Sequence, residues 1–486
     1  MNELKRTIHQ YELAHCIMCH DALCTKACNK MDPAGKLRSV WFDNDAVAAF
    51  GMPDNFPCAQ CEAPCESVCV TESVPIKLIM SQLDSMKNNG LAAEYDYDLL
   101  KADFCGIEIE NPFLLSSSVV SSTYEMCARA FDAGWAGAAF KTICMMEIHE
   151  TSPRFSAVHN DLGAIACFRN IEQLSDHSVV ENLDVFRRLK KDYPNKLLVA
   201  SIMGRNEEEW EELSKAVTEA GADAIELNFS CPNMTEDGTG SDVGQVPELV
   251  EKYTAAARRG SKLPILAKLT PNVAEMSSAA EAAVRGGADG LAAINTIKSI
   301  INTDDGKVTV GGLSGNAVKP IALRFITEMS GNKKLAGKHI SGMGGIETWR
   351  DALEFIGYGA GTVQVTTAVM EYGYRIIDDL RSGMAAFLKA NGMTMKDCVG
   401  VYINKLKDVE DVERDIVIYP KFNRLYCLGC GRCYISCLDG GHQAISMDEE
   451  RRPILDPKRC VGCHLCIIVC PGEAIQSSGV VIKKKG

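Results

Sequence analysis

The sequence lacks any long apolar run. Its 486 residues contain no stretch of the roughly 20 apolar residues that a membrane-spanning helix needs. The segment from Met1 to Gln10 is polar, and no apolar segment of the kind found in secretory signal peptides follows it. Both absences predict a cytoplasmic protein. In a reducing cytoplasm, we expect the 22 cysteines to be thiols or metal ligands instead of disulfides.

Positive charge is outnumbered by negative charge, with 51 lysines and arginines against 64 aspartates and glutamates. The formal net charge is −13, whereas a general nucleic-acid-binding protein needs a basic face to neutralise phosphates. A dinucleotide-binding motif is missing too. No G-x-G-x-x-G follows a predicted strand and opens a helix with an acidic residue about 20 positions later. The sequence therefore predicts no nucleic-acid partner and no nicotinamide site.

The middle of the chain is poor in cysteine, because 16 of the 22 cysteines lie near its two ends. Near the C-terminus, the spacing C-x2-C-x2-C-x3-C occurs twice, as in bacterial ferredoxins with two [4Fe–4S] clusters. In such ferredoxins the fourth cysteine of each run ligates the other cluster. The predicted ligand sets are Cys427, Cys430, Cys433 and Cys470 for one cluster, and Cys460, Cys463, Cys466 and Cys437 for the other. A zinc ribbon is the alternative, but it would leave the third and fourth cysteines of each run unused.

The N-terminal set also contains eight cysteines, with less regular spacing. They are Cys16, Cys19, Cys24, Cys28, Cys58, Cys61, Cys65 and Cys69. This spacing suits iron–sulfur clusters, and a zinc-binding module is the alternative. Electrons are therefore expected to enter or leave through the ends of the chain, with the chemistry between them.

The middle of the chain alternates short apolar runs with longer amphipathic segments. The predicted strands are 112–117, 137–142, 197–203, 224–229, 264–269, 290–295, 339–342 and 362–366. Helical patterns lie between most of them, as at 207–220, 246–260, 273–286 and 347–355. Eight strand–helix units favour a TIM (β/α)8 barrel in an α/β chain, and a doubly wound open sheet is the alternative. The predicted domains are 1–100, 101–395 and 396–486, the last a linker with the ferredoxin-like domain.

The segment Asn228-Phe229-Ser230-Cys231-Pro232-Asn233 follows the fourth predicted strand. In a barrel this is the C-terminal mouth, where catalytic loops lie. The polar, glycine-rich segment 235–244 that follows is typical of a mobile lid. Cys231 is therefore a candidate acid–base residue. The alternative is a buried, inert cysteine, which we expect for Cys105, Cys127, Cys144, Cys167 and Cys398.

The N-terminal cysteine pattern resembles the helical iron–sulfur domain of dihydropyrimidine dehydrogenase and of the small subunit of glutamate synthase. The matching residues are Cys16-Ile17-Met18-Cys19, Cys24, Cys28 and Cys61-Glu62-Ala63-Pro64-Cys65-Glu66-Ser67-Val68-Cys69. The resemblance implies two [4Fe–4S] clusters, one held by Cys16, Cys19, Cys24 and Cys69, the other by Cys28, Cys61, Cys65 and a fourth ligand. Cys58 is the simplest fourth ligand. Dihydropyrimidine dehydrogenase uses a glutamine there, and Gln82 lies at a similar place.

The middle of the chain resembles the pyrimidine-reducing module of the dihydropyrimidine dehydrogenase family, in particular its bacterial catalytic subunit. The resemblance covers residues 102–486. It rests on Glu226-Leu227-Asn228-Phe229-Ser230-Cys231-Pro232, Ala267-Lys268-Leu269-Thr270-Pro271-Asn272, Asn295-Thr296 and Gly311-Gly312-Leu313-Ser314-Gly315. Dihydroorotate dehydrogenases share the barrel and the Asn-x-Ser-Cys-Pro type of segment. The cluster domain joins the barrel directly here, unlike in the animal enzymes, which carry FAD and NADPH domains between the two. In the usual bacterial arrangement, the cluster domain belongs to the flavoprotein partner.

The resemblance implies an FMN at the barrel mouth. Its phosphate would lie at Gly344, Gly345, Thr366 and Thr367, near the ends of the last two strands. The other implied flavin contacts are Ser117, Lys141, Thr142, Lys268 and Gly315. Lysines suit the flavin because a cation stabilises the anionic reduced ring.

The resemblance also implies a set of substrate-binding residues. They are Asn170, Glu172, Asn228, Ser230, Asn295 and Thr296. Amides can pair with the alternating carbonyl and N–H groups of uracil, and a carboxylate can accept from a ring N–H. Orotate would need a cation for its carboxylate, and the sequence offers no clear one.

The predicted function is FMN-dependent reduction of the ring double bond of uracil or thymine, with Cys231 as the general acid. The expected electron donor is an NAD(P)H-oxidising flavoprotein or a ferredoxin, acting through four [4Fe–4S] clusters. The resemblance implies a homodimer, in which the ferredoxin-like domain of one subunit serves the flavin of the other. The alternatives are a dihydroorotate dehydrogenase-like or other cyclic-imide or enone reductase, and a non-catalytic electron-transfer subunit.

Overall fold

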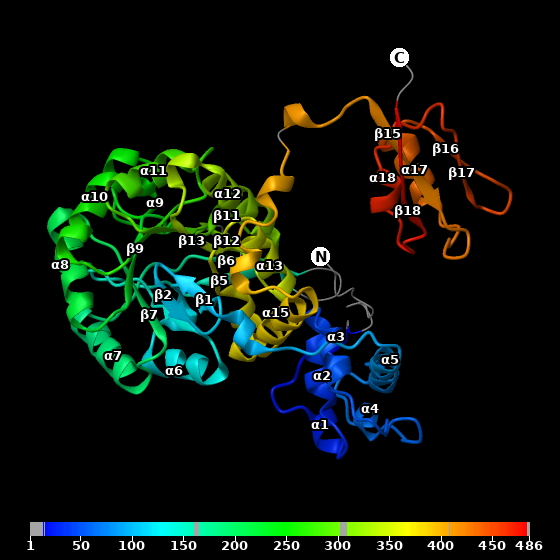
Figure 1. The fold of residues 1–486 in the computed structure, drawn as a ribbon, viewed down its shortest axis with the longest axis horizontal. Coiled ribbons are helices and arrows are strands. Elements are labelled where there is room, and N and C mark those ends of the chain that lie inside the picture. Colours follow the sequence, from blue (N-terminus) through cyan, green and yellow to red (C-terminus); the bar gives the residue numbers. More distant parts are fainter. Residues whose placement is uncertain (1–12, 14, 160–164, 302–308, 408, 484–486) are drawn as a thin grey trace. The chain divides into compact units, whose positions relative to one another are not determined.

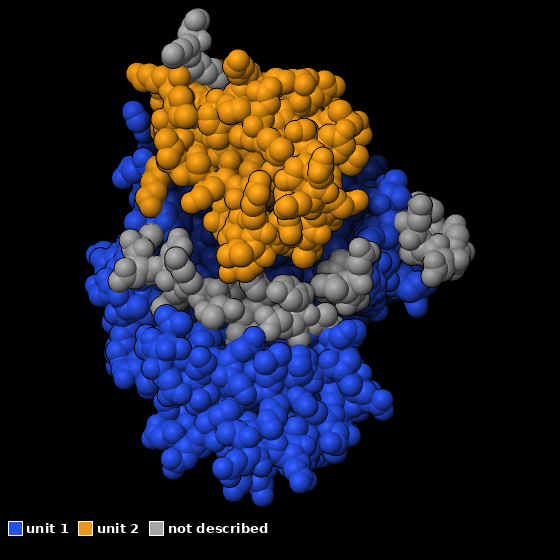
Figure 2. Space-filling view, turned by 90° about the vertical axis from the view of Figure 1, so that its right-hand side faces the viewer, with its two compact units in different colours: residues 1–404 blue, residues 405–486 orange. Residues whose placement is uncertain are grey.

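The computed structural model describes residues 13, 15–159, 165–301, 309–407 and 409–483. The chain divides into two compact units, residues 1–404 and 405–486 (Figure 2). The predicted boundary near residue 100 lies inside the first unit and stays a prediction. Among the described residues, no helix combines the length and the apolarity that a membrane crossing requires.

The first unit contains a barrel of parallel strands (Figure 1). They are β3 (Phe113–Leu115), β4 (Gly137–Ala139), β7 (Leu197–Ile202), β8 (Ala224–Asn228), β9 (Ile265–Lys268), β10 (Gly290–Ala293), β13 (His339–Met343) and β14 (Thr362–Val365). They close in the order β10-β13-β14-β3-β4-β7-β8-β9. Each overlaps a predicted strand, so the predicted TIM barrel is confirmed and the open sheet was the wrong alternative. The strands are almost wholly buried, because side chains fill the barrel and helices cover it.

Helices surround the barrel strands (Figure 1). The long ones are α6 (Tyr124–Ala133), α7 (Val179–Asp192), α8 (Glu207–Glu219), α10 (Pro247–Gly260), α11 (Ser277–Arg285), α12 (Lys319–Gly331), α13 (Trp349–Gly357) and α15 (Ile377–Asn391). Shorter helices are α9 (Ser241–Gly244), α14 (Thr367–Tyr372) and α16 (Met395–Cys398). After α8 and α11, Gly221 and Gly287 adopt φ angles of +96° and +105°. Glycine reaches this left-handed region without strain, which ends the helix and turns the chain into the next strand.

A second sheet lies outside the barrel and was not predicted. It contains β5 (Phe155–His159), β6 (Ile165–Asn170), β11 (Ile297–Ile300) and β12 (Val310–Ser314). These strands pair antiparallel in the order β11-β12-β6-β5. The two hairpins follow β4 and β10 in the chain, so they leave the barrel at its C-terminal mouth. Asn170 ends β6 and Gly315 directly follows β12, so the pairing of these two strands brings two predicted site residues near each other.

The N-terminal part of the first unit is helical. It contains α1 (Leu23–Ala27), α2 (Pro33–Trp41), α3 (Asp45–Phe50), α4 (Pro64–Ser67) and α5 (Ile76–Asn88). These helices enclose a small apolar core of their own, in which α5 contributes Ile76, Ile79, Met80, Leu83 and Met86. The core includes the side chains of Cys58 and Cys65. Cysteine side chains therefore replace part of the apolar packing that a domain of this size needs.

The helical part docks on the barrel through a buried carboxylate, Asp379 of α15, which is 2% exposed. Its oxygens accept hydrogen bonds from Arg38 Nε at 2.7 Å, Ser39 Oγ at 2.6 Å and Asn44 Nδ2 at 3.3 Å. Asn44 Nδ2 also donates to Ser382 Oγ at 2.8 Å. A buried carboxylate is stable only when such donors compensate its lost hydration, so these contacts hold the two parts in one arrangement.

The second unit is a small α/β fold around eight cysteines. Strand β15 (Ile416–Phe422) pairs antiparallel with β18 (Ile475–Lys483), and β16 (Ile445–Met447) pairs with β17 (Pro453–Leu455). Helices α17 (Arg432–Gly440) and α18 (Leu465–Ile468) follow the two cysteine-rich loops. Its apolar core includes Cys433 and Cys466.

Replacing Asp379 by alanine tests the docking contact. Asp379→Ala leaves Arg38, Ser39 and Asn44 without their acceptor, and we expect it to lower the free energy of unfolding by about 3 kcal/mol. The control is Glu94→Ala, which breaks an exposed ion pair with Lys389 between the same two parts and should cost less than about 1 kcal/mol. Denaturant unfolding followed by fluorescence measures both. Equal losses in the two variants would contradict this account of the interface.

Candidate active site

A cleft opens at the C-terminal ends of the barrel strands. It encloses about 1070 Å³ of empty space, counted to its open mouth. Its lining includes every residue that was predicted to bind flavin or substrate or to act in catalysis, except Ser230. Ser230 is fully buried behind the lining. The barrel therefore brings together residues spread from Ser117 to Thr367.

Glycines and threonines form one end of the cleft, after β13 and β14. Gly344 and Gly345 have φ angles of +120° and +83°. A Cβ atom at Gly345 would lie 2.9 Å from the carbonyl oxygen of Gly315 and from the backbone nitrogen of Lys319, so only glycine fits. Barrel enzymes place phosphate sites after the seventh and eighth strands, which are β13 and β14 here. This end therefore has the position and the open backbone of a phosphate site.

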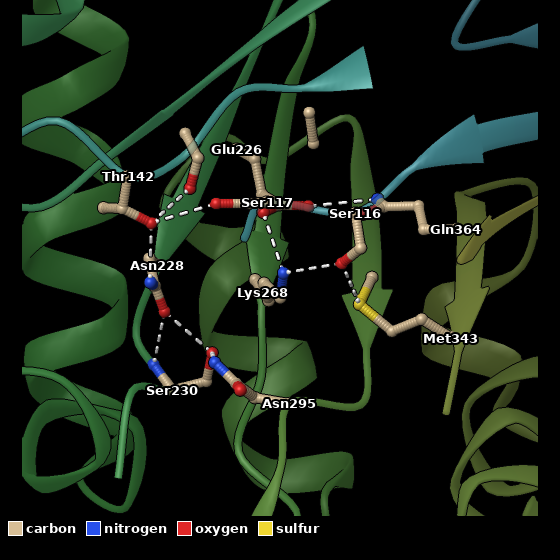
Figure 3. A network of polar contacts seen from close by, with 12 residues as sticks. Ser116, Ser117, Thr142, Glu226, Asn228, Ser230, Lys268, Asn295, Met343 and Gln364 are labelled. Atoms are coloured by element: carbon tan, nitrogen blue, oxygen red, sulfur yellow. Dashed lines mark hydrogen bonds and ion pairs between the residues drawn. The ribbon is translucent and has the colours of Figure 1, made fainter. Parts of the chain in front are cut away.

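A buried ion pair lies at the centre of the barrel mouth (Figure 3). Lys268 Nζ lies 3.2 Å from Glu226 Oε1, and the two side chains are 3% and 0% exposed. The other oxygen of Glu226 accepts from Gln364 Nε2 at 3.1 Å, and Lys268 donates to Ser116 Oγ at 3.4 Å. Among the described residues, Gln364 Oε1 has no hydrogen-bond partner although it is buried. A bound ring with an N–H group facing Gln364 would satisfy this acceptor.

A chain of amides and hydroxyls lines the next part of the cleft (Figure 3). Asn228 Nδ2 donates to Thr142 Oγ1, and Ser230 Oγ donates to Asn228 Oδ1, both at 2.9 Å. Asn295 Nδ2 donates to Ser230 Oγ, also at 2.9 Å. Ser230 thus holds Asn228 and Asn295 in fixed orientations, and these two amides line the cleft. Fixed amides can present both donors and acceptors to a flat polar ring.

Cys231 lies beside these amides and is 6% exposed. Burial raises the pKa of its thiol to about 11, so the thiol is protonated at neutral pH. The segment after it folds back, and the backbone nitrogen of Ser241 donates to the Cys231 carbonyl at 2.9 Å. A Cβ at Gly240 would lie 2.4 Å from that carbonyl oxygen, so a glycine is needed there. Whether segment 235–244 moves as a lid stays a prediction.

Four charged side chains meet beside the cleft, and the sequence predicted only the two that line it, Lys141 and Glu172. Lys141 Nζ lies 3.5 Å from Glu172 Oε1 and 3.6 Å from Glu150 Oε1. Arg154 Nη1 lies 3.0 Å from Glu172 Oε1. Glu150 and Arg154 belong to the stretch between β4 and β6, where no apolar periodicity marks a site. Arg154 is a cation near the predicted substrate residues, and no sequence pattern revealed it. Glu172 neutralises its charge.

Glu347 is a further residue that the sequence did not reveal. It lines the cleft two positions after Gly345. Burial raises the pKa of its carboxyl to about 7, and the nearby carboxylates of Asp351 and Glu371 add to that rise. The carboxyl can therefore carry a proton near neutral pH at the end of the cleft that is suited to phosphate.

The N-terminal cysteines form two groups. One cavity of the first unit is lined by Cys16, Cys19, Cys24 and Cys69, which is the first ligand set that the resemblance implied. Burial raises the pKa of Cys16, and the charges of Cys24, Cys69 and Cys19 raise it further. Burial also raises the pKa of Cys65 to about 11, helped by Cys28 and Cys58. Burial and the charges of Cys28 and Cys61 raise the pKa of Cys58. Cys58 and Cys61 therefore lie with the second group.

The C-terminal cysteines divide in the same manner. One cavity is lined by Cys427, Cys430, Cys433 and Cys470, and another by Cys437, Cys460, Cys463 and Cys466. These are the two sets that the spacing predicted. Among the described residues, no three His, Cys, Asp or Glu side chains converge closely enough to hold a single metal ion. A [4Fe–4S] cubane has a wider arrangement, because each of its four cysteines binds a different iron.

Of the five cysteines that were expected to be buried, three are buried and two are not. Cys127, Cys144 and Cys398 are buried, as expected. Cys105 and Cys167 are only half-buried, so their prediction as buried residues was wrong. Cys105 lies in a two-residue turn with a φ angle of +52°, and Cys167 lies on β6, whose side chains are mostly half-buried.

Comparison with known families assigns both halves of this arrangement. The dihydroorotate dehydrogenase family matches residues 99–388, and the 4Fe–4S dicluster domain family matches residues 421–477. The ligand-free dihydroorotate dehydrogenase of Eimeria tenella superposes with a TM-score of 0.53 and 20% identity, over 63% of this chain and 94% of that one. This likeness concerns the fold alone.

Characterised relatives are more similar in sequence. The NAD-dependent dihydropyrimidine dehydrogenase subunit PreA of Escherichia coli K12 is 53% identical over 398 residues, which cover 79% of this chain and 97% of the relative. The chloroplastic dihydropyrimidine dehydrogenase (NADP(+)) of Arabidopsis thaliana is 35% identical over 62% of this chain and 76% of its own. The catalytic subunit of dihydroorotate dehydrogenase B (NAD(+)) from Pyrococcus abyssi is 35% identical over 62% and 99%. The chain therefore belongs to the PreA-type family of dihydropyrimidine dehydrogenase subunits, is an oxidoreductase, and combines a dihydroorotate dehydrogenase barrel with a 4Fe–4S dicluster domain.

Proposed function

We propose that the chain reduces the 5,6-double bond of uracil or thymine in the barrel cleft, with FMN as the redox group. The observation that carries this proposal is the lining of the cleft. It combines oriented amides on Asn228 and Asn295, a carboxylate on Glu172 and a buried protonated thiol on Cys231. A pyrimidine ring needs amide and carboxylate partners, and its reduction needs a proton donor.

The residues of the cleft fit both the phosphate and the ring of FMN. Gly344 and Gly345 would receive the phosphate with their backbone N–H groups, and Thr366 and Thr367 would add hydroxyls. Lys268 would lie near the pyrimidine edge of the flavin, where its charge stabilises a reduced ring. The unpartnered Gln364 Oε1 fits a ring N–H donor. When bound, FMN supplies the hydride for the substrate double bond.

Cys231 provides the proton for the other carbon of the double bond. Its thiol is protonated at neutral pH because burial disfavours the thiolate. In the reverse direction, the oxidation of a dihydropyrimidine, the thiolate must take the proton back. Asn228 and Asn295 donate hydrogen bonds where the carbonyl of the ring gains charge, and Ser230 holds both of them.

Recognition of the ring depends on groups that are already oriented. Asn233 Nδ2 donates to Asn170 Oδ1 at 3.2 Å and to the Glu172 carbonyl at 2.9 Å, which fixes the loop that carries both residues. The Thr296 backbone nitrogen donates to Asn295 Oδ1 at 2.7 Å. A site with such fixed polar groups rejects rings that leave them unpaired. Uracil and thymine pair with them.

Electrons would reach the flavin through four [4Fe–4S] clusters, two in the N-terminal part and two in the second unit. Cys58 is the proposed fourth ligand of the second N-terminal cluster, because its thiol lies with Cys28 and Cys61. The donor would be a separate NAD(P)H-oxidising flavoprotein or a ferredoxin. The E. coli relative is described as a subunit of an NAD-dependent enzyme, which favours the flavoprotein. A homodimer remains the proposed state of this chain.

Oxidation of dihydroorotate is the second candidate function, because Arg154 places a cation next to Glu172, which lines the cleft. A free guanidinium could bind the orotate carboxylate. Here Arg154 is already paired with Glu172 at 3.0 Å, and a carboxylate ligand would meet the charge of Glu172. The neutral pyrimidines therefore suit the site better.

Replacing Cys231 by alanine tests the proposed acid. Cys231→Ala should retain flavin and iron but reduce uracil at least about 100-fold more slowly, because general acid catalysis typically contributes at least that factor. The control is Cys105→Ala, which removes a half-buried thiol outside the cleft and should leave the rate unchanged. Anaerobic stopped-flow measurement of flavin oxidation by uracil gives both rates. A Cys231→Ala rate equal to that of the control would rule out the assignment.

The pKa of Cys231 predicts opposite pH effects in the two directions. Uracil reduction needs the thiol, which persists up to a pH of about 11. Oxidation of dihydrouracil needs the thiolate, so its rate should rise with pH by up to tenfold per unit towards that value. The rate of flavin reduction by dihydrouracil, measured from pH 7 to 10, checks this prediction. A flat profile over that range would contradict the role of Cys231 as the base.

A further inference from the structure

The cavity of the first N-terminal cysteine group has a wall that comes from the barrel. Its lining includes Cys16, Cys19, Cys24 and Cys69, and it also includes Arg375. Arg375 belongs to a short 3-10 helix, Tyr374–Ile376, that directly precedes α15. The other lining residues come from the N-terminal part. One side of this cavity is therefore built by a residue more than 300 positions away in the chain.

Arg375 is hydrogen-bonded to the loop that carries the first two cysteines. Its Nη2 donates to the Met18 carbonyl at 2.7 Å, and its Nη1 donates to the Cys19 carbonyl at 3.5 Å. Met18 has a φ angle of +50°, an uncommon conformation for a residue with a side chain, and it packs against the core of the barrel. The guanidinium therefore holds the loop Cys16–Cys19 in its shape and on the barrel.

The remaining hydrogen bond of Arg375 goes to the barrel backbone. This third hydrogen bond, from Nε, goes to the Tyr372 carbonyl at 3.2 Å. Among the described residues, no carboxylate lies within ion-pair distance of it. The other basic residues of the cavity differ, because Arg38 pairs with Asp379 and Lys26 pairs with Asp21. The cavity therefore faces a guanidinium with which no described carboxylate forms an ion pair.

A [4Fe–4S] cluster with four thiolate ligands is an anion, and it becomes more negative when it is reduced. A nearby cation stabilises the reduced form more than the oxidised form, which raises the reduction potential. An unpaired guanidinium in the wall is the group that such a cluster needs.

We infer that Arg375 of the barrel is the charge-compensating residue of the N-terminal cluster held by Cys16, Cys19, Cys24 and Cys69. This inference rests on the proposed function, which places a cluster there. The site is then built jointly by the N-terminal part and the barrel. Arg375 is a positioning residue, since it acts on the cluster through its charge and through the loop carbonyls.

The segment that carries Arg375 also borders the flavin cleft. Thr366 and Thr367 line the cleft, and α14 leads from them to Tyr372, three residues before Arg375. The ring of Tyr372 packs edge-on against Phe42 with centroids 5.1 Å apart, and the ring of Trp41 lies 6.4 Å away. One continuous piece of the barrel therefore contacts both the cluster cavity and the proposed flavin site.

The test compares the full-length chain with Arg375→Gln and Arg375→Lys. Redox titration followed by EPR spectroscopy measures the midpoint potential of the cluster, whose signal is identified by its loss in Cys69→Ala. We expect Arg375→Gln to shift this potential to more negative values. Arg375→Lys retains the charge and should stay close to the unmodified protein. Lys389→Gln is the matched control, because it removes a positive charge at the same interface but outside the cavity.

The possible outcomes are distinct. An unchanged potential in Arg375→Gln, with the cluster intact, overturns the inference. If Arg375→Gln loses the cluster, the potential of Arg375→Lys decides, and a negative shift in Arg375→Lys that exceeds the shift in Lys389→Gln contradicts the role of the charge. Loss of the cluster in both variants, with the remaining iron retained, also contradicts it. If Cys69→Ala has the same iron content and spectrum as the unmodified chain, no cluster is present and the proposed function itself fails at this point.

Discussion

The buried pair of Lys268 and Glu226 is the interaction on which the cleft depends. Barrel interiors of this fold are filled mainly by branched apolar side chains, and a lone charge there would be very unfavourable. The two residues lie on the adjacent strands β9 and β8, with Lys268 opposite Asn228 and two positions beyond Glu226, and their side chains meet at 3.2 Å, so each can compensate the other. Gln364 on β14 and Ser116 after β3 complete the pair from the opposite side of the barrel. The upper layer of the barrel is therefore polar, and it can receive a polar, redox-active ring above the apolar layers.

A second buried charge, away from the cleft, also needs partners that compensate it. Asp379 is buried where the N-terminal helices meet the barrel, and it is stable because three donors from those helices reach it. Arg375 is the opposite case, since its charge faces the cysteine-lined cavity without an acidic partner among the described residues. Asp379, with its donors, thus fixes the arrangement of the first unit. Arg375, without a described acidic partner, marks where we expect a negatively charged group to bind.

Sequence patterns predicted the strands and the cysteine sets because both depend on local spacing. The barrel strands are short apolar runs, and the two C-terminal cysteine runs repeat one fixed spacing. The outer sheet of β5, β6, β11 and β12 escaped prediction, because its short strands are half-buried and rich in polar residues and glycine. Glu150, Arg154 and Glu347 were missed for a related reason. Their environment is created by contacts with residues distant in the chain, which periodicity does not encode. The contact of Arg375 with Met18 is of the same kind.

Under the proposed function, the cysteine-rich ends conduct electrons and the barrel cleft uses them. The most direct test is anaerobic purification with quantification of flavin and iron, followed by photoreduction and addition of uracil, thymine or orotate. The account predicts about one FMN per chain, iron for four clusters, and reoxidation by uracil or thymine but not by orotate. Absence of bound FMN, or reoxidation by orotate alone, would contradict it.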